Sequence, residues 1–523
     1  MNFNRESKTL AWLPYSVGCL ISYAKKNPEV NERYEFMEPL FLSWDPKRYR
    51  TLLMEADILG LTCYSWNQGY NDRLAHYYKN LKPDGIVIYG GPQVPENKEA
   101  REKWLNDRKF LDHCIEGPAE IAFTEWLLDL PRSYKVLKEL PTPYTDGIFD
   151  NLLSMSEKLG APVESDRGCP YSCAFCDWGG NTRSKLIKFD YDTFMKEIDW
   201  IYSKKEIGET FLSNANFGIL KRDVEIMRGI ADVQKKYGRD DFLFVYGGLA
   251  KNGSKNLKPI MDILLNEINI LQHNMKVSFQ THTPEVLKII KRDNISNEKL
   301  MPLVRHWQGM GKTVAAEMII GLPGETADSW LKSLDYMIHD LGISKAGTFI
   351  LQVTRNTLLD DPEFQEKYGI KTKRVWYGDK QYGLTVINEC FSFDLEELVR
   401  MFDNHWVWNN FVNTEIIPPS NLISLYDQTQ LFFSKLDEMP LMRELVERNR
   451  RTVRKVFKPE RDVYLYDKNE VTWFSATLRQ DDLLIMESNK EQALRELSTV
   501  FDVPEDLKFE IVDNGYRKIP EVK

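Results

Sequence analysis

Three cysteines lie close together in the segment CPYSCAFC. Cys169 and Cys173 are four positions apart, and Cys176 follows three positions later. Three thiolates on one loop suit an iron–sulfur cluster, whose remaining iron is then open to a substrate or cofactor. Zinc is the alternative, but structural zinc normally has four protein ligands, and no further Cys or His lies nearby in the sequence. The spacing therefore favours iron–sulfur chemistry.

The composition bounds the kind of protein that carries this motif. The chain has 523 residues, a formal net charge of −9, and 28% charged residues. At about 100–200 residues per domain, several domains are expected. A nucleic-acid partner is not expected, because phosphate binding needs a basic face. The basic run from Arg448 to Lys455 follows Glu444 and Glu447, and it is expected to be a solvated helix face.

The chain has no apolar run of 18 or more residues and begins with a polar segment. We therefore expect neither a membrane span nor a signal peptide, and a cytoplasmic location. Cysteines stay reduced there, so a tight cluster indicates metal binding or catalysis. The four scattered cysteines are expected to be buried apolar residues, and they are Cys19, Cys63, Cys114 and Cys390.

The elements that position the motif follow an α/β pattern. Residues 56–64 and 85–92 read as buried strands, with helical spacing over 72–81 between them. This rhythm predicts a doubly wound, Rossmann-like domain over residues 1–135. Ligands of such sheets bind at the carboxyl ends of the strands, which here are residues 64–67 and 90–93.

Beyond a connector at residues 136–160, six strand–helix units predict a partial (β/α)6 TIM barrel over residues 161–385. The strands are expected at residues 162–164, 209–213, 242–246, 276–280, 314–320 and 348–353. The cysteines follow the first strand, where barrel enzymes place their chemistry. The aromatic remainder, residues 386–523, predicts a helical C-terminal domain.

The motif Cys-x3-Cys-x2-Cys, with Phe175 before its last cysteine, resembles the signature of the radical S-adenosylmethionine (SAM) superfamily. The resemblance implies that Cys169, Cys173 and Cys176 hold three irons of a [4Fe–4S] cluster, and that SAM chelates the fourth. It also implies reductive cleavage of SAM to a 5′-deoxyadenosyl radical, with an electron from a flavodoxin- or ferredoxin-type donor. The residues implied to contact SAM are Phe175, Asn214, Asn216, Ser278, Gln280, Glu317 and Gly321.

The first region resembles the cobalamin-binding (B12-binding) domain that precedes the radical domain in the class B methylase-like subfamily. The residues implied to contact cobalamin are Ser16, Gly18, Tyr64, Ser65, Trp66, Asn67, Gly90, Gly91, Pro92, Gln93, Val94, Glu116 and Gly117. The Asp-x-His-x-x-Gly pattern that supplies a lower cobalt ligand is absent. Trp66 is then either near the lower face of cobalt or an ordinary core aromatic. The polar segment before Leu13 lacks the usual first strand, so the sheet is expected to be one strand short or the start to be late.

Together these resemblances imply a cobalamin-dependent radical SAM methyltransferase that acts on an unactivated carbon of a small molecule or peptide. One SAM methylates cob(I)alamin, a second yields the radical, and the substrate radical takes the methyl group. The alternatives are a cobalamin-bearing oxidoreductase or rearrangement enzyme that does not methylate, and a sensor without catalysis. His282 follows the fourth expected strand, as a proton relay or as a neighbour of a helix cap.

Overall fold

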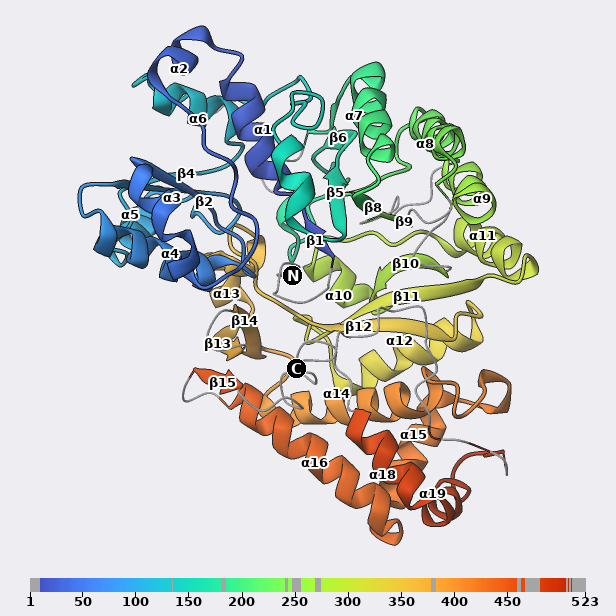
Figure 1. Cartoon of the computed structure of the whole chain (residues 1–523). Helices are drawn as coiled ribbons and strands as arrows, with labels where there is room; N and C mark the ends of the chain where they lie inside the picture. The colour runs from blue at the N-terminus through green and yellow to red at the C-terminus, as the bar shows by residue number, and fades with distance from the viewer. Residues whose placement is uncertain are drawn as a thin grey trace.

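The computed structural model describes residues 10–133, 135–179, 185–239, 243–246, 255–268, 274–377, 382–458, 462–465, 480–504, 507 and 509. The N-terminal part lies beside the central strands and helices, and the C-terminal helices lie beneath them in Figure 1. Within these ranges no helix combines the length and the apolar character that crossing a bilayer requires.

The N-terminal part contains a parallel sheet with the order β2-β3-β4. Its strands are β2 (Ile58–Thr62), β3 (Ile86–Gly90) and β4 (His113–Ile115). Helix α4 (Gln68–Leu81) connects the first two strands and α5 (Lys98–Asn106) the next two, which confirms the expected strand–helix–strand rhythm. Among the described strands the order follows the chain without reversal, whereas a doubly wound sheet reverses its order. The other helices of this part are α1 (Tyr15–Ala24), α2 (Pro28–Arg33), α3 (Arg50–Glu55) and α6 (Glu120–Leu127).

The first described strand belongs to a different sheet. β1 (Ala11–Trp12) pairs in parallel with β5 (Leu159–Val163), so that Ala11 lies opposite Leu159. The described chain is therefore first part of the central region and then enters the N-terminal part through α1, which packs against α6. The predicted division near residue 135 separates β1 from the strand with which it pairs.

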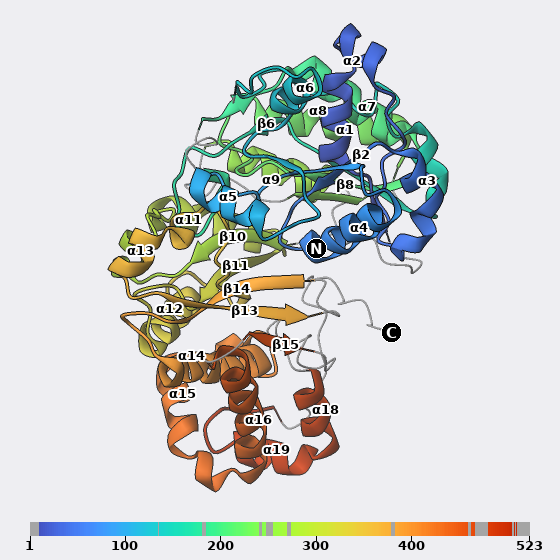
Figure 2. The ribbon, with the colours of Figure 1, turned by 90° about the vertical axis from the view of Figure 1, so that its left-hand side faces the viewer.

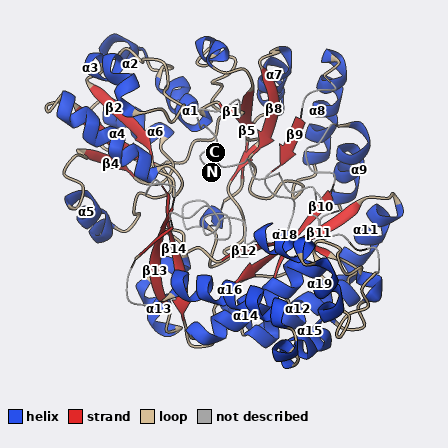
Figure 3. Cartoon of the chain, turned by 60° about the horizontal axis from the view of Figure 1, so that its bottom comes forward, coloured by secondary structure: helices blue, strands red, loops and turns tan. Residues whose placement is uncertain are grey.

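The described part of the central region contains seven parallel strands in two sheets, β1-β5-β8-β9 and β10-β11-β12. The strands after β5 are β8 (Ile207–Leu212), β9 (Leu243–Tyr246), β10 (Asn274–Gln280), β11 (Thr313–Ile320) and β12 (Lys345–Ile350). Each of the six expected strands overlaps one of them. The helices between them are α7 (Tyr191–Ser203), α8 (Asp223–Tyr237), α9 (Leu257–Glu267), α10 (Pro284–Ile289), α11 (Asn297–Gly309) and α12 (Ala327–His339). In Figure 3 the helices α7, α8, α9, α11 and α12 lie outside the strands, which follow an arc. A short antiparallel pair, β6 (Asp166–Arg167) and β7 (Ile187–Lys188), follows β5.

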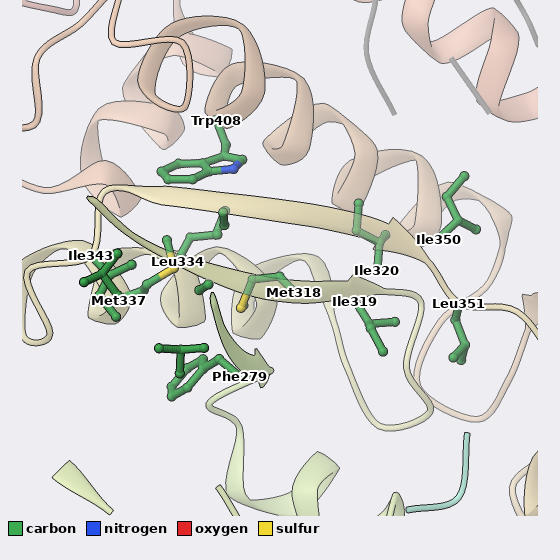
Figure 4. Close-up of a cluster of buried hydrophobic side chains, with 14 of the residues drawn as sticks. Phe279, Met318, Ile319, Ile320, Leu334, Met337, Ile343, Ile350, Leu351 and Trp408 are labelled. Atoms are coloured by element: carbon green, nitrogen blue, oxygen red, sulfur yellow. The ribbon is translucent and has the colours of Figure 1, made fainter. Parts of the chain in front are cut away.

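Alternation along the strands separates the core from the opposite face of the sheet. Met275, Val277 and Phe279 of β10 are buried in the large apolar core, whereas Lys276 and Ser278 point to the other face. Side chains from β10, β11 and β12 meet those of α12 in this core, and Figure 4 shows part of it. The strand ends are thereby fixed on a rigid support.

The C-terminal part begins with an antiparallel hairpin of β13 (Lys371–Tyr377) and β14 (Tyr382–Glu389), and β15 (Val463–Leu465) pairs with β13. Sequence analysis missed this sheet, and the predicted boundary at residue 385 falls inside β14. Figure 2 shows the hairpin between the N-terminal part and the C-terminal helices. The helices are α13 (Pro362–Lys367), α14 (Leu395–Val407), α15 (Leu425–Ser434), α16 (Pro440–Phe457), α18 (Gln480–Ser488) and α19 (Lys490–Leu497).

The basic run lies on α16, but it is not a purely solvated face. Arg450 contacts Asp403 of α14 at 2.8 Å, and Arg448 contacts Asp482 of α18 at 3.3 Å. Both arginine side chains are about three-quarters buried. The prediction of a solvated face is therefore wrong for these two arginines, because other helices supply buried carboxylates.

Candidate active site

The three clustered cysteines lie on one loop at the carboxyl end of the first long central strand. Cys169 and Cys173 are buried, and Cys176 is half-buried. The loop is held on two sides, because Ala174 donates its N–H to Ile290 at 2.8 Å and accepts from Leu359 at 3.1 Å. The backbone that carries the motif is therefore tied to two other parts of the central region.

The donor set of this loop fits an iron–sulfur cluster in its chemistry. In the part of the chain that the structure describes, no three Cys, His, Asp or Glu side chains are gathered as a ready metal site. The Arg292 guanidinium lies 3.9 Å from the Cys173 sulfur, which places positive charge where a ligated cluster carries negative charge. A cavity of about 140 Å³ adjoins them and is lined by residues 170–173 and 291–293.

Arg292 is a site residue that sequence analysis missed. Its side chain is 4% exposed, and it donates to the carbonyl oxygen of Ser278 and, at 2.9 Å, to Asn294. It therefore connects the cysteine loop to the end of β10. The sequence contains no signal for this role, since Arg292 and Cys173 are 119 residues apart.

Four of the residues expected to contact SAM lie at the ends of β10 and β11. Ser278 donates to a carboxylate oxygen of Glu317 at 2.7 Å, across the two strands. Gln280 has a φ of +69°, and Gly321 one of +88°. The pairing of the strands shifts register between Ser278 and Gln280. The structure thus brings the predicted polar groups together at an irregular strand end, a kind of backbone strain that clusters at functional sites.

The other three expected SAM contacts lie on neighbouring segments. Asn214 is buried and uses its amide to accept from Ser165 and to donate to Asp166 at 2.6 Å. This use is structural, so its predicted contact with SAM stays a prediction. Asn216 is also buried, and Phe175 packs partly against the central core.

His282 contacts a surrounding helix. The ring of His282 stacks on Tyr336 of α12 with 3.5 Å between the centroids. The backbone N–H of His282 donates to the Ser333 hydroxyl at 3.1 Å. Burial lowers the pKa of the His282 ring. These contacts favour the interpretation of His282 as a neighbour of a helix cap over a role as a proton relay.

The loops after β2, β3 and β4 meet at the carboxyl edge of the N-terminal sheet. The backbone N–H of Cys63 donates to the carbonyl oxygen of Gly90. The carbonyl oxygen of Cys63 accepts from the backbone N–H of Gln93 at 3.0 Å. Gly91 has a φ of +117°, and a Cβ there would lie 3.0 Å from the Cys63 carbonyl oxygen. Only glycine allows this close approach at that φ.

An aromatic platform lies on this edge. Tyr64 and Trp66 stack with their ring centroids 4.5 Å apart, and Trp66 is 39% exposed. This exposure argues against Trp66 as an ordinary core aromatic. Asn67 shapes the loop by accepting from the Tyr64 N–H at 2.8 Å and donating to Thr62. Ser65 is half-buried in the same turn, and Gly117, after β4, has open space at its Cβ position.

Other residues expected to contact cobalamin have structural explanations. A Cβ on Gly18 would lie 2.3 Å from the Phe149 ring, so this glycine permits close packing of α1. Glu116 is buried and pairs with Arg101 at 3.0 Å and Arg132 at 3.4 Å. Ser16 is exposed on α1. Their contact with cobalamin stays a prediction.

The carboxyl edges of the two regions face each other and are tied together. Arg167, after β5, contacts Glu120, after β4, at 2.7 Å. Asn356, after β12, donates to the carbonyl oxygens of Pro92 at 3.0 Å and Val94 at 2.9 Å. The cysteine loop and the aromatic platform thus belong to two strand edges that meet at one junction.

One segment of the chain matches a known protein family. The model of the Radical SAM superfamily matches residues 163–337, which span the cysteine loop and the strands β8, β9, β10 and β11. This segment of the chain is similar to radical SAM domains. The chain is 28% identical to the cobalamin-dependent radical SAM methyltransferase TokK of Streptomyces tokunonensis. It is 29% identical to the 2-(S-pantetheinyl)-carbapenam-3-carboxylate methyltransferase of Streptantibioticus cattleyicolor.

Each of these two alignments covers 70% of this chain, but the chain spans only 57% of either relative's length. The fold is similar to that of the cobalamin-dependent SAM radical enzyme OxsB with aqua-cobalamin bound, with a TM-score of 0.53 at 13% identity. That similarity covers 96% of this chain and 80% of OxsB. The methyltransferase TsrM of Kitasatospora setae also has a TM-score of 0.53, at 15% identity, over 70% of this chain and 79% of TsrM.

Proposed function

We propose that the protein is a cobalamin-dependent radical SAM methyltransferase that acts on a small molecule. Two relatives support the reaction class, since TokK and the carbapenam-carboxylate enzyme are both methyltransferases. The name of one relative also specifies a small-molecule carbapenam substrate. Reduction of the cluster is assigned to a flavodoxin- or ferredoxin-type donor in the cytoplasm.

The observation that carries the proposal is the meeting of two strand edges. Arg167–Glu120 and Asn356–Val94 join the loops that would hold the cluster and SAM to the loops that would hold cobalamin. A radical on the substrate is short-lived, so the methyl donor has to lie at the same site. Two cofactors on facing edges meet this requirement.

When bound, the cluster with SAM supplies a 5′-deoxyadenosyl radical, and cobalamin supplies a methyl group. The chain's own residues would bind and orient these groups. Cys169, Cys173 and Cys176 would ligate the cluster, and Arg292 would balance its charge. Glu317, oriented by Ser278, would accept hydrogen bonds from SAM. The platform of Tyr64 and Trp66 would lie against the corrin, because a flat aromatic pair suits a broad apolar face.

The test uses the full chain, reconstituted anaerobically with iron, sulfide and hydroxocobalamin. The reduced protein is incubated with SAM that carries a deuterated methyl group, and the cobalamin is analysed by mass spectrometry. We expect deuterated methylcobalamin, S-adenosylhomocysteine and 5′-deoxyadenosine. 5′-Deoxyadenosine without methylated corrin would favour the oxidoreductase or rearrangement alternative, and absence of both products would favour a sensor.

A further inference from the structure

Three arginines from separate parts of the chain converge where the N-terminal sheet meets the hairpin β13–β14. Arg108 follows α5, Arg355 follows β12, and Arg374 lies on β13. Burial and the nearby charges of Arg355 and Arg108 lower the pKa of Arg374. Arg108 and Arg355 also lie close enough to the Cys63 thiol, after β2, to act on it electrostatically. Positive charge is thus concentrated beside the edge that is expected to bind cobalamin.

The hydrogen bonding of this arginine cluster (Arg108, Arg355 and Arg374) is incomplete. The Arg374 guanidinium lies over the Trp376 ring at 4.5 Å and makes a long hydrogen bond of 3.4 Å to the Gly383 carbonyl oxygen. The Nε–H groups of Arg374 and Arg108 are both buried without an acceptor. Buried N–H groups normally have a partner, and a buried charge without one is costly.

The nearby carboxylates do not neutralise the arginine cluster. Asp72 accepts from the Tyr89 hydroxyl at 2.9 Å and lies 3.8 Å from Arg108. Asp360 accepts from a backbone N–H at 3.3 Å. Across the described ranges, neither Arg355 nor Arg374 has a carboxylate within ion-pair distance. Asp72 and Asp462 act on Arg374, and Asp360 acts on Arg355, at longer range.

Guanidinium groups bind phosphate and carboxylate through paired N–H donors, and several together suit one oxyanion. We propose that Arg108, Arg355 and Arg374 form a binding site for a phosphate or carboxylate group of a small molecule held at the junction. The oxyanion has two possible sources. One is the phosphodiester in the nucleotide tail of cobalamin, which rests on the proposed function. The other is an acidic group of the substrate.

The first test measures thermal unfolding of the full chain with inorganic phosphate or with chloride at equal ionic strength. We expect about 20 mM phosphate to raise the Tm by about 2 °C, because a ligand of the folded state stabilises it. Arg374→Met and Arg355→Gln should abolish this rise. Without phosphate, Arg374→Met should unfold at the wild-type temperature or above it, since it removes a buried charge that lacks a partner.

A matched control is Arg228→Gln, which removes an exposed arginine paired with Glu267 and should keep the phosphate effect. No rise in Tm for the wild type would overturn the proposal. It would also be overturned if the variants lowered the Tm in chloride and kept the rise in phosphate, because the arginines would then be structural.

The second test identifies the source by comparing cobalamin with cobinamide, which has the same corrin but lacks the nucleotide and its phosphodiester. If the phosphodiester is the ligand, Arg355→Gln and Arg374→Met should weaken cobalamin binding about tenfold and leave cobinamide binding unchanged. If the substrate supplies the anion, both corrinoids should bind the variants as they bind the wild type. A wild-type chain that binds neither corrinoid would contradict the proposed function, while the phosphate measurement would still decide the anion site.

Discussion

The side-chain amide of Asn356 donates to the carbonyl oxygen of Val94 at 2.9 Å, across 262 residues of sequence. The same amide donates to Pro92, and its oxygen accepts from the Glu96 N–H at 2.9 Å. One side chain therefore fixes the whole loop after β3 against the central region. Its φ of +65° is one that asparagine tolerates better than most residues.

We expect Asn356→Asp to reduce the cobalt retained per chain after gel filtration by at least about half, because a carboxylate repels the two carbonyl oxygens that the amide binds. Asn356→Gly keeps the φ but removes the same bonds, so it should have a similar effect. Asn266→Asp, in a helix away from the junction, is the control. Full cobalt retention in both Asn356 variants would show that this contact does not support the site.

Arg167 is the second link between the two edges. It is mostly buried and pairs with both Glu120 and Glu164. Arg167→Met would leave two buried carboxylates unpaired and should lower the free energy of unfolding by about 3 kcal/mol. Urea denaturation measures this loss, and Glu120→Gln in the same chain should restore part of it. The exposed pair Arg454–Glu396 is the control, where Arg454→Met should cost less than about 1 kcal/mol. Equal losses of unfolding free energy in Arg167→Met and Arg454→Met would contradict the claim that the buried ion pair is the more important one for stability.

Asp166 should make stability depend on pH. Burial, reinforced by Asp223, raises its pKa to about 7. In the unfolded chain the pKa of Asp166 is about 4, so the folded state binds the proton on this carboxyl more tightly. The contribution of Asp166 is therefore fully present below about pH 4 and is lost as the pH rises through about 7.

Asp166→Asn removes this titration, so its Tm relative to wild type should rise between pH 5 and pH 8. Glu197 and Asp403 also have pKa values of about 7, which is why the difference between variant and wild type is the informative quantity. A difference that stays constant with pH would rule out Asp166 as the titrating group.

Glu317 is the strongest candidate for a SAM contact at the end of β11. Glu317→Gln should weaken SAM binding to the reconstituted protein about tenfold, because a charged acceptor becomes neutral. Ser278→Ala should have a smaller effect, since it only releases the carboxylate that it orients. Equilibrium dialysis measures both, with Glu389→Gln on β14 as the control. Unchanged affinity in Glu317→Gln would remove this residue from the SAM site.

The elements with strong periodicity could be predicted from the sequence. The central strands are short apolar runs with alternating burial, as in β10, and six of the seven described ones were expected at overlapping positions. The strand β1 was not expected. The hairpin β13–β14 was missed because its sequence mixes charged and apolar residues. It is stabilised through pairing between its strands and with the distant β15.

The site could be predicted only where its residues are close in sequence. The cysteine loop and the turn from Tyr64 to Asn67 are local motifs, and both lie at strand ends in the structure. Arg292 and Asn356 could not be found in this way, because their partners lie 119 and 262 residues away. Arg450 was misjudged for the same reason, since Asp403 reaches it from another helix.

The measurement that tests the account most directly is the iron and cobalt content of the anaerobically reconstituted chain. We expect about four irons and one cobalt per chain for the wild type. Cys173→Ala should lose iron and retain cobalt, and Cys390→Ala, whose thiol lies outside the motif, should lose neither metal. Four irons without cobalt in the wild type would contradict the proposal of two cofactor sites on facing edges. Loss of cobalt without loss of iron in Cys173→Ala would contradict it as well.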